Sequence, residues 1–188
     1  MNPVTVAIDP GHSGGIAVRY PHSVAAYPMP DTDADTLDTL REIIATARRE
    51  GWPVSAVVEK VGGYVGGKGQ PGSAMFTFGE SFGFLCGCLM ALEIPLRLVR
   101  PQQWQAALQL GKSTGHASKA AWKRHLRAEA ARRFPQLRPT LATADALLLL
   151  DAAAILAGTA NTLGQTPTAS REAPAHSPQP REKGTNDE

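Results

Sequence analysis

The order of short apolar runs and longer amphipathic segments constrains the fold of this chain more than any other feature of its sequence. Strands joined by short turns pair antiparallel, whereas strands joined through a helix pair in parallel. Three strand-like runs come first, separated only by turn residues, and two more follow, each after a helical segment. We therefore expect an α/β domain of three layers, with a central mixed five-stranded sheet flanked by helices. The expected strands cover residues 4–8, 15–19, 23–29, 53–61 and 94–101, and the expected helices cover 33–51, 73–92, 102–110, 119–134 and 142–158.

Glycine recurs every four residues in the apolar segment 73–92, which has the length and composition of a buried helix. Gly79, Gly83 and Gly87 share one helix face, where their missing side chains allow another backbone to come close. Such a stripe serves either packing within the chain or a contact between two copies. We expect intramolecular packing or a mixture of both.

Length and composition indicate one domain with a tail. The chain has 188 residues, of which 43% are hydrophobic, and this suffices for one core of ordinary size. All periodic segments lie within residues 1–159. Residues 160–188 are rich in proline, serine, threonine and charge, so we expect a disordered C-terminal tail there.

The cysteines and the N-terminus predict a cytoplasmic protein. Cys86 and Cys88 are the only cysteines. A disulfide across one intervening residue is strained, and two thiols cannot complete a zinc site, so they are expected as buried hydrophobes in a reducing compartment. The N-terminus lacks the pattern of a secretory signal. The apolar stretch 74–92 contains Glu80 and three glycines, which disfavours a membrane span.

Three carboxylates interrupt otherwise apolar segments. Asp9 and Glu59 each end a predicted core strand, and Asp145 lies early in an apolar helix. In open α/β sheets, ligands bind beyond the carboxyl ends of such strands, so the three side chains can converge on one point. Three unpaired carboxylates repel one another, and a divalent cation removes that cost. Magnesium binds oxygen ligands and is held by a few carboxylates together with substrate phosphate.

Each carboxylate also has a structural interpretation. Asp9 can form a turn with Pro10 and Gly11, and Asp145 can complement the dipole at a helix N-terminus. Glu59 can pair with Lys60. The metal-site interpretation rests on the combination, because three independent structural roles would have to coincide to explain all three carboxylates.

A basic segment precedes the last helix. The net charge is only +2, so any nucleic-acid interaction must depend on local charge. Lys119, Lys123 and Arg127 are spaced by four and share a helix face. This face is either a ridge that binds phosphates or simply a solvated surface. The predicted nucleic-acid-binding residues are Lys68, Lys112, Lys119, Lys123, Arg124 and Arg127.

Six segments occur in a distinctive order, namely "AIDPGHSGGIAV", "AVVEKVGG", "GSAMFTFGESFGFLCGCLMAL", "IPLRLVRPQQWQAALQL", "KAAWKRHLRAEAARRFP" and "TADALLLLDAA". Together they resemble the RuvC-type Holliday junction resolvases of the ribonuclease H-like superfamily, in the short form seen in phages and their bacterial relatives. The resemblance extends roughly from residue 4 to residue 156. It implies a ribonuclease H-like fold and a location in a bacterial cell or a phage-infected host.

The resemblance also implies a site and an activity. Asp9, Glu59 and Asp145 would be the catalytic metal ligands, binding Mg²⁺ or substituting Mn²⁺, with two ions in each site. The implied enzyme is a homodimeric endodeoxyribonuclease that resolves four-way or branched DNA in recombination and repair. Many such proteins have a further Asp or His shortly before the last aspartate, where this chain has Leu141 and Ala142. Asp151 lies about 240° further around the helix and is expected to point away.

Three other functions remain to be distinguished. A ribonuclease H-like nuclease for another branched DNA or RNA substrate would have the same carboxylates. A catalytically inactive junction-binding protein would bind junctions without cutting them. An actin-like or sugar-kinase ATPase would need a second such domain, for which this chain is too short.

Overall fold

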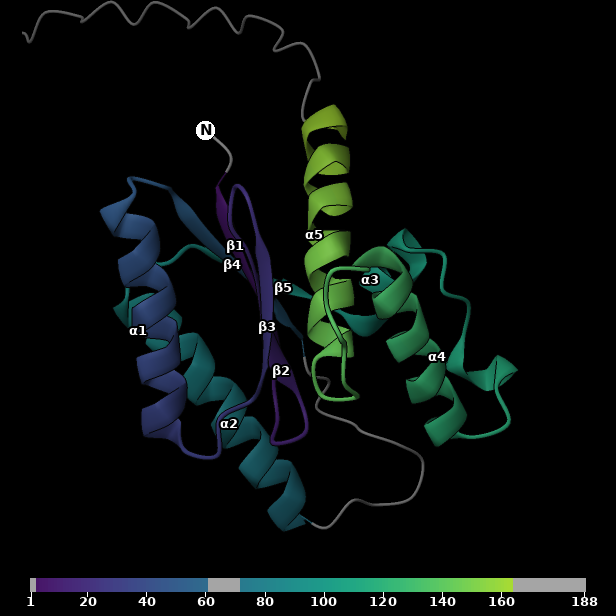
Figure 1. The fold of residues 1–188 in the computed structure, drawn as a ribbon. Helices are drawn as coiled ribbons and strands as arrows, with labels where there is room; N and C mark the ends of the chain where they lie inside the picture. The colour runs from purple at the N-terminus through teal and green to yellow at the C-terminus, as the bar shows by residue number, and fades with distance from the viewer. Residues whose placement is uncertain (1–2, 61–71, 164–188) are drawn as a thin grey trace, which may run out of the picture.

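The protein is described by a computed structural model over residues 3–60 and 72–163 (Figure 1). The five strands form one sheet in the order β3-β2-β1-β4-β5. β1 pairs antiparallel with β2, which pairs antiparallel with β3, while β1–β4 and β4–β5 are parallel. The mixed five-stranded sheet expected from the sequence is thus confirmed. The strands are β1 (Val4–Asp9), β2 (Gly15–Arg19), β3 (Val24–Pro28), β4 (Val54–Glu59) and β5 (Leu96–Val99).

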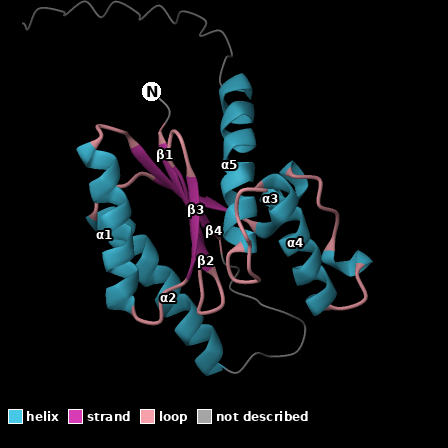
Figure 2. Ribbon diagram, viewed as in Figure 1, coloured by secondary structure: helices cyan, strands magenta, loops and turns pink. Residues whose placement is uncertain are grey.

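Helices cover both faces of the sheet and give the expected three layers (Figure 2). On one face lie α1 (Asp33–Arg49) and α2 (Gly72–Ala91), and on the other lie α3 (Pro101–Ala107), α4 (Lys119–Arg133) and α5 (Ala144–Leu163). The helix α1 begins where the side chain of Thr32 accepts a hydrogen bond from the backbone N–H of Asp35. It ends before Gly51, whose positive φ of 69° suits a residue without a side chain.

Alternation along β1 divides the core into two clusters. Val4, Val6 and Ile8 pack with α1 and α2, whereas Ala7 packs with α5 on the opposite face. Successive side chains of a strand point to opposite faces, so Asp9 continues the row of Ala7 and faces α5.

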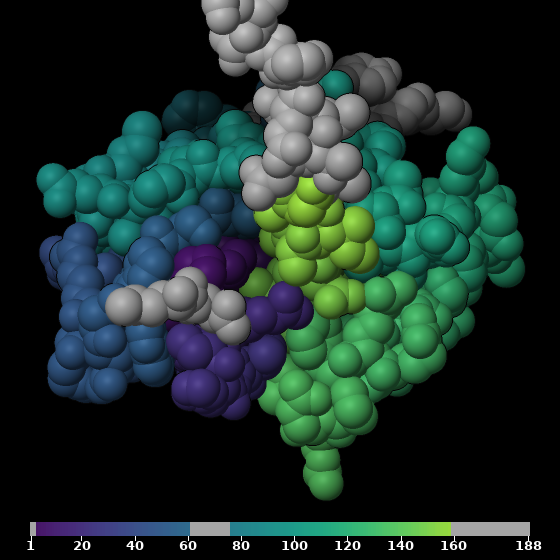
Figure 3. All heavy atoms as spheres, turned by 90° about the horizontal axis from the view of Figure 1, so that it is seen from above, coloured from purple at the N-terminus to yellow at the C-terminus, as the bar shows by residue number. Residues whose placement is uncertain are grey.

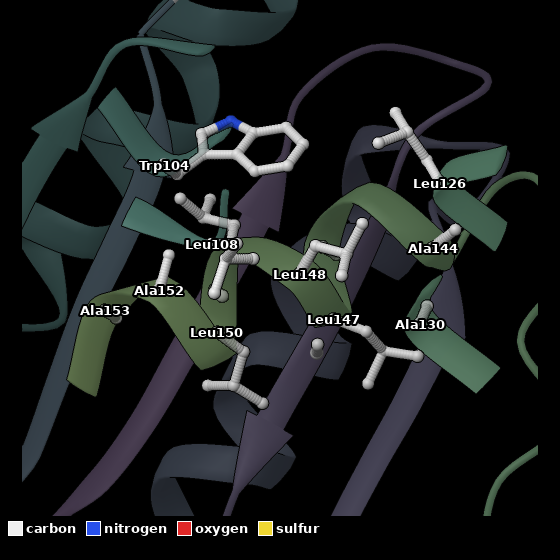
Figure 4. Close-up of a cluster of buried hydrophobic side chains, with 14 of the residues drawn as sticks. Trp104, Leu108, Leu126, Ala130, Ala144, Leu147, Leu148, Leu150, Ala152 and Ala153 are labelled. Carbon is white, nitrogen blue, oxygen red and sulfur yellow. The ribbon is translucent and has the colours of Figure 1, made fainter. Parts of the chain in front are cut away.

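The helix α5 forms the centre of the second cluster (Figure 4). Its residues 147–150 are four consecutive leucines, each no more than 1% exposed, because the helix is covered by the sheet on one side and by α3 and α4 on the other. Trp104 from α3 and Leu126 from α4 complete this packing. A helix buried on nearly all sides holds its first turn, which carries Asp145, in a fixed position relative to the sheet.

Two expectations from the sequence were wrong. Gly158 does not end the last helix, since α5 continues to Leu163, so the predicted tail boundary at residue 160 falls inside it. A single glycine costs a helix only about 1 kcal/mol, which neighbouring turns tolerate. The glycine stripe of α2 does not pack within the described part of the chain either. A Cβ at Gly79, Gly83 or Gly87 would have nothing within 4 Å.

Figure 3 views the molecule along α5 from its C-terminal end, and the yellow-green atoms of this helix lie between the blue residues of α1 and the green residues of α4. A cavity of about 560 Å³ lies toward this end, between the sheet and Ala153, Ala154 and Ala157 of α5. Its lining includes none of the residues Asp9, Glu59 and Asp145. Among the described residues, no helix is long and apolar enough to cross a membrane.

Candidate active site

The pairing of β1 with β4 places Asp9 beside Glu59. The two strands run in parallel with Ile8 opposite Val58, and Asp9 and Glu59 are the residues that follow on each strand. Each carboxylate lies two residues after a residue that faces α5: Asp9 comes two after Ala7, and Glu59 two after Val57. The alternation of side chains along each strand therefore brings the two carboxylates to the same face and the same end of the sheet.

The turn after β1 brings the start of α5 toward Asp9. Gly11 has a φ of 112°, and a Cβ on Gly14 would lie 2.0 Å from the carbonyl oxygen of Asp9, so both positions need glycine. Gly15 pairs with Asp9 across the hairpin. A Cβ on Gly15 would lie 2.8 Å from the carbonyl oxygen of Ala142, two residues before α5. The close approach allowed by Gly15 thus places the first turn of α5 next to the end of β1.

Asp145 enters the site from the first turn of α5. Thr140 and Thr143 exchange hydrogen bonds between their hydroxyls and backbone N–H groups, which fixes the chain before the helix. Asp145 is only 7% exposed, and its Oδ2 accepts a hydrogen bond of 2.5 Å from Nζ of Lys123. Its other oxygen, Oδ1, is buried and has no hydrogen-bond partner among the described residues.

Glu59 is held by Trp104. The indole Nε1 donates a hydrogen bond of 2.9 Å to Oε2 of Glu59. Trp104 is itself only 1% exposed, because α3 buries it in the core. An indole has one donor and no acceptor, so a buried tryptophan fixes the orientation of its partner. Glu59 is thus positioned from the core, and no ion pair joins it to Lys60 in the described structure.

Each of the three carboxylates interacts electrostatically with the other two. Burial, followed by the charges of Glu59 and Asp145, raises the pKa of Asp9 to about 8, although Lys123 opposes the shift. Burial also raises the pKa of Glu59 to about 7, against the hydrogen bond from Trp104. Burial lowers the pKa of Lys123, but the attraction of Asp145 outweighs it and leaves that pKa raised. Neighbouring buried carboxylates with pKa values raised in this way are typical of a functional site.

The donor atoms of this cluster suit a hard divalent cation. All three side chains supply carboxylate oxygens, the ligands that Mg²⁺ and Mn²⁺ prefer. Oδ1 of Asp145 is a buried acceptor without a described donor, which a cation would satisfy. Among residues 3–60 and 72–163, however, no three carboxylate, imidazole or thiolate side chains already stand in the arrangement of a metal centre. The ligand atoms of the cluster therefore suit a divalent cation. In this structure its carboxylates interact with the ammonium of Lys123, which donates a hydrogen bond to Asp145.

The predicted basic residues do not all lie in one place. Lys119 and Lys123 line a cavity of about 450 Å³ with Ser113, His116 and Trp122. Lys112, Arg124 and Arg127 are exposed, whereas Lys68 lies outside the described residues. Lys123, predicted to contact nucleic acid, contacts the predicted catalytic carboxylate Asp145.

Asp151 points away from the cluster, as its position along the helix predicts. It binds Arg133 of α4 at 2.8 Å and Arg19 of β2 at 3.5 Å. The neighbours that precede Asp145 supply no further carboxylate or imidazole, since they are Leu141, Ala142 and Thr143.

Sequence reasoning missed the roles of Trp104 and Lys123. Trp104 has the neighbours of an ordinary core residue, and no spacing links it to Glu59, 45 positions earlier. For Lys123, the sequence contains a weak indication that its side chain is partly buried. In the predicted helix 119–134 it lies one residue from Trp122 and three from Leu126, both buried, so its stem lies at the margin of the buried face.

Comparisons with known proteins support the fold. The structure of RuvC from Thermus thermophilus matches with a TM-score of 0.52 at 17% sequence identity, covering 84% of this chain and 96% of that one. RuvC from the same organism in complex with a Holliday junction substrate matches with a TM-score of 0.52 at 18% identity, covering 83% and 96%. No protein-family model matches this chain. No curated protein matches it either. The chain thus has a RuvC-like, ribonuclease H-like fold, as the sequence predicts.

Proposed function

We propose that this protein is a metal-dependent endodeoxyribonuclease that resolves four-way DNA junctions during recombination and repair. The proposal rests on one observation above all. Asp9, Glu59 and Asp145 come from three separate elements and meet, largely buried, at the carboxyl ends of β1 and β4. The fold adds support, because one structure that shares it is a RuvC bound to a Holliday junction substrate.

The three carboxylates would hold the divalent cation, Mg²⁺ or Mn²⁺. When bound, the cation would supply Lewis acidity that polarises the phosphodiester and eases deprotonation of the attacking water. Trp104 keeps the Glu59 carboxylate oriented by donating to Oε2. The buried leucines of α5 keep Asp145 in place beside Asp9 and Glu59.

The basic residues would bind the DNA backbone next to the carboxylates. Lys119 lies in the same cavity as Lys123, and Lys112, Arg124 and Arg127 extend the positive surface along the loop before α4 and along α4 itself. Each phosphate contact releases condensed counterions, so binding should weaken with the logarithm of salt concentration. We assign these residues to backbone binding, which orients the junction without reading its sequence.

The decisive experiment compares DNA structures with and without magnesium. The purified full chain is incubated with a labelled synthetic four-way junction, a linear duplex and a flap, each with Mg²⁺ or with EDTA. We expect paired nicks in the junction only with Mg²⁺, and at most slow cutting of the duplex. The products should carry 5′-phosphates.

Two other results would replace the proposal. Cleavage of flaps or RNA–DNA hybrids but not of junctions would identify a ribonuclease H-like nuclease with another substrate. Binding to the junction without magnesium-dependent cutting would identify an inactive junction-binding protein.

We further propose that the enzyme is a homodimer that places one site on each of two opposing strands. The exposed face of α2 would form the contact. Phe76 and Met90 are 71% and 65% exposed on this helix, and a Cβ on Gly79 or Gly83 would meet open space. Large exposed apolar side chains beside a glycine stripe suit close packing of two helices.

Replacing Gly83 by leucine should disrupt this contact. The folded monomer has room for the side chain, so the variant should keep its circular dichroism spectrum while its sedimentation coefficient falls to that of a monomer. Glu42→Leu, which adds a leucine at an exposed position of α1, is the matched control and should leave the association unchanged. A Gly83→Leu variant that folds normally and stays dimeric would remove the proposed contact.

A further inference from the structure

Lys123 lies inside the carboxylate cluster, although it belongs to a helix of exposed basic residues. Its side chain is 33% exposed, and that of Asp145, which it contacts at 2.5 Å, is only 10% exposed. Asp9 and Glu59 also lie within electrostatic reach of its ammonium group. Lys123 is held there by its own helix, because Trp122 and Leu126 on either side are buried in the core.

The cluster has few ligands for more than one cation. Its described acidic side chains are Asp9, Glu59 and Asp145, and one oxygen of Asp145 is already bound to Lys123. Thr143, the nearest preceding polar side chain, has its hydroxyl engaged with Thr140. Asp151 is bound to Arg133 and Arg19. Beyond the oxygens of a substrate phosphate, these described side chains leave few ligands to share between two adjacent divalent cations.

The charges in the cluster balance one divalent cation. Three carboxylates and one ammonium leave two negative charges, which a single Mg²⁺ or Mn²⁺ neutralises. A second divalent cation would make the same set strongly positive and would approach an ammonium in a partly buried site, where charges are poorly screened.

We propose that the site takes one divalent cation and that the ammonium of Lys123 supplies the positive charge that a second cation would otherwise bring. This inference rests on the proposed function and changes one of its expectations, the two ions implied by the resemblance. Lysine suits the role because its ammonium is a compact charge with three donors, able to hold Asp145 and donate to a phosphate oxygen at the same time.

The test counts cations rather than reaction products. The full chain, stripped of metal and without DNA, is titrated with Mn²⁺ by calorimetry, and free Mn²⁺ is followed by its electron paramagnetic resonance signal. We expect one Mn²⁺ per chain for the natural protein. Lys123→Met should either admit a second Mn²⁺ or bind the first at least about tenfold more tightly, because a nearby like charge has been removed.

Two further measurements keep the test specific. Arg127→Met removes one exposed positive charge a single turn further along α4 and should leave both the number and the affinity of Mn²⁺ unchanged. Single-turnover cleavage of a four-way junction by the natural protein should rise with the first power of free Mn²⁺ concentration.

The possible outcomes separate the two proposals. Two Mn²⁺ per chain in the natural protein, a second-power dependence of cleavage, or unchanged binding in Lys123→Met would each overturn the role of Lys123 while leaving a metal-dependent nuclease intact. No Mn²⁺ binding by the natural protein, with or without junction DNA, would overturn the proposed function itself.

Discussion

Replacing Asp9 by asparagine should reduce magnesium-dependent cleavage of a four-way junction by about a thousandfold or more. Asp9 is the central member of the cluster, flanked by Glu59 across the parallel pair and by Asp145 from α5. Asparagine keeps the size of the side chain but removes its charge, and a lost metal ligand costs several kcal/mol of charge stabilisation in the transition state. Glu59→Gln should have a similar effect. Cleavage is measured under single-turnover conditions at saturating Mg²⁺.

The matched control is Asp151→Asn, which changes an aspartate on the same helix as Asp145. Asp151 binds Arg133 and Arg19 on the far side of α5 and does not face the cluster. Its amide can still accept from Arg133, so junction cleavage should stay within a few-fold of the natural rate. Binding of the junction in EDTA should survive in all three variants. Undiminished cleavage by Asp9→Asn or Glu59→Gln would rule out the assignment of these carboxylates as the active site.

The architecture could be predicted because it follows from local patterns. The spacing between apolar runs tells which strands are joined by turns and which by helices, and this decides between antiparallel and parallel pairing. Asp9 and Glu59 could be located for the same reason. Each ends a core strand, and the carboxyl ends of parallel strands lie at one edge of a sheet.

The contacts that orient those carboxylates could not be predicted. Trp104 reaches Glu59 only because α3 folds back beneath the sheet, and Lys123 reaches Asp145 only because α4 packs along α5. Neither contact produces a regular spacing of residues in the sequence. A pattern of spaced lysines describes a helix face, whereas the depth at which each ammonium lies depends on the neighbouring helix.

The glycine stripe misled for a related reason. Regular spacing in α2 correctly places Gly79, Gly83 and Gly87 on one face, but it does not tell which face the sheet covers. Leu85, Cys88 and Leu89 supply the buried face instead, which leaves the glycines outward. Small residues can thus mark a surface for another molecule as readily as a site of internal packing.

The metal-free protein should become less stable as the pH rises from about 5 to 8. Asp9 and Glu59 have pKa values of about 8 and about 7 in the folded protein, above their ordinary values of 3.8 and 4.5. In this window the folded state therefore binds protons that the unfolded state has already released. Stability falls with pH wherever the folded state binds more protons, by up to about 1.4 kcal/mol per pH unit for each group.

The measurement is the melting temperature in EDTA across this pH range. A loss of a few kcal/mol corresponds to a fall of roughly 5–10 °C for a chain of this size. Asp9→Asn removes the most strongly shifted group, so its melting temperature should depend less on pH and should exceed that of the natural protein at pH 8. A melting temperature of the natural protein that stays level or rises toward pH 8 in EDTA would contradict the assignment.

Added Mg²⁺ should reverse the effect in the natural protein. A cation that binds only the folded state stabilises it by mass action, and it binds most tightly when the carboxylates are ionised, near pH 8. The same addition should leave Asp9→Asn almost unchanged, since this variant lacks the central ligand. We thus expect Asp9→Asn to be more stable than the natural protein without metal and inactive in cleavage with Mg²⁺. This combination would mean that the same repulsion among the three carboxylates that destabilises the metal-free protein creates the cation site.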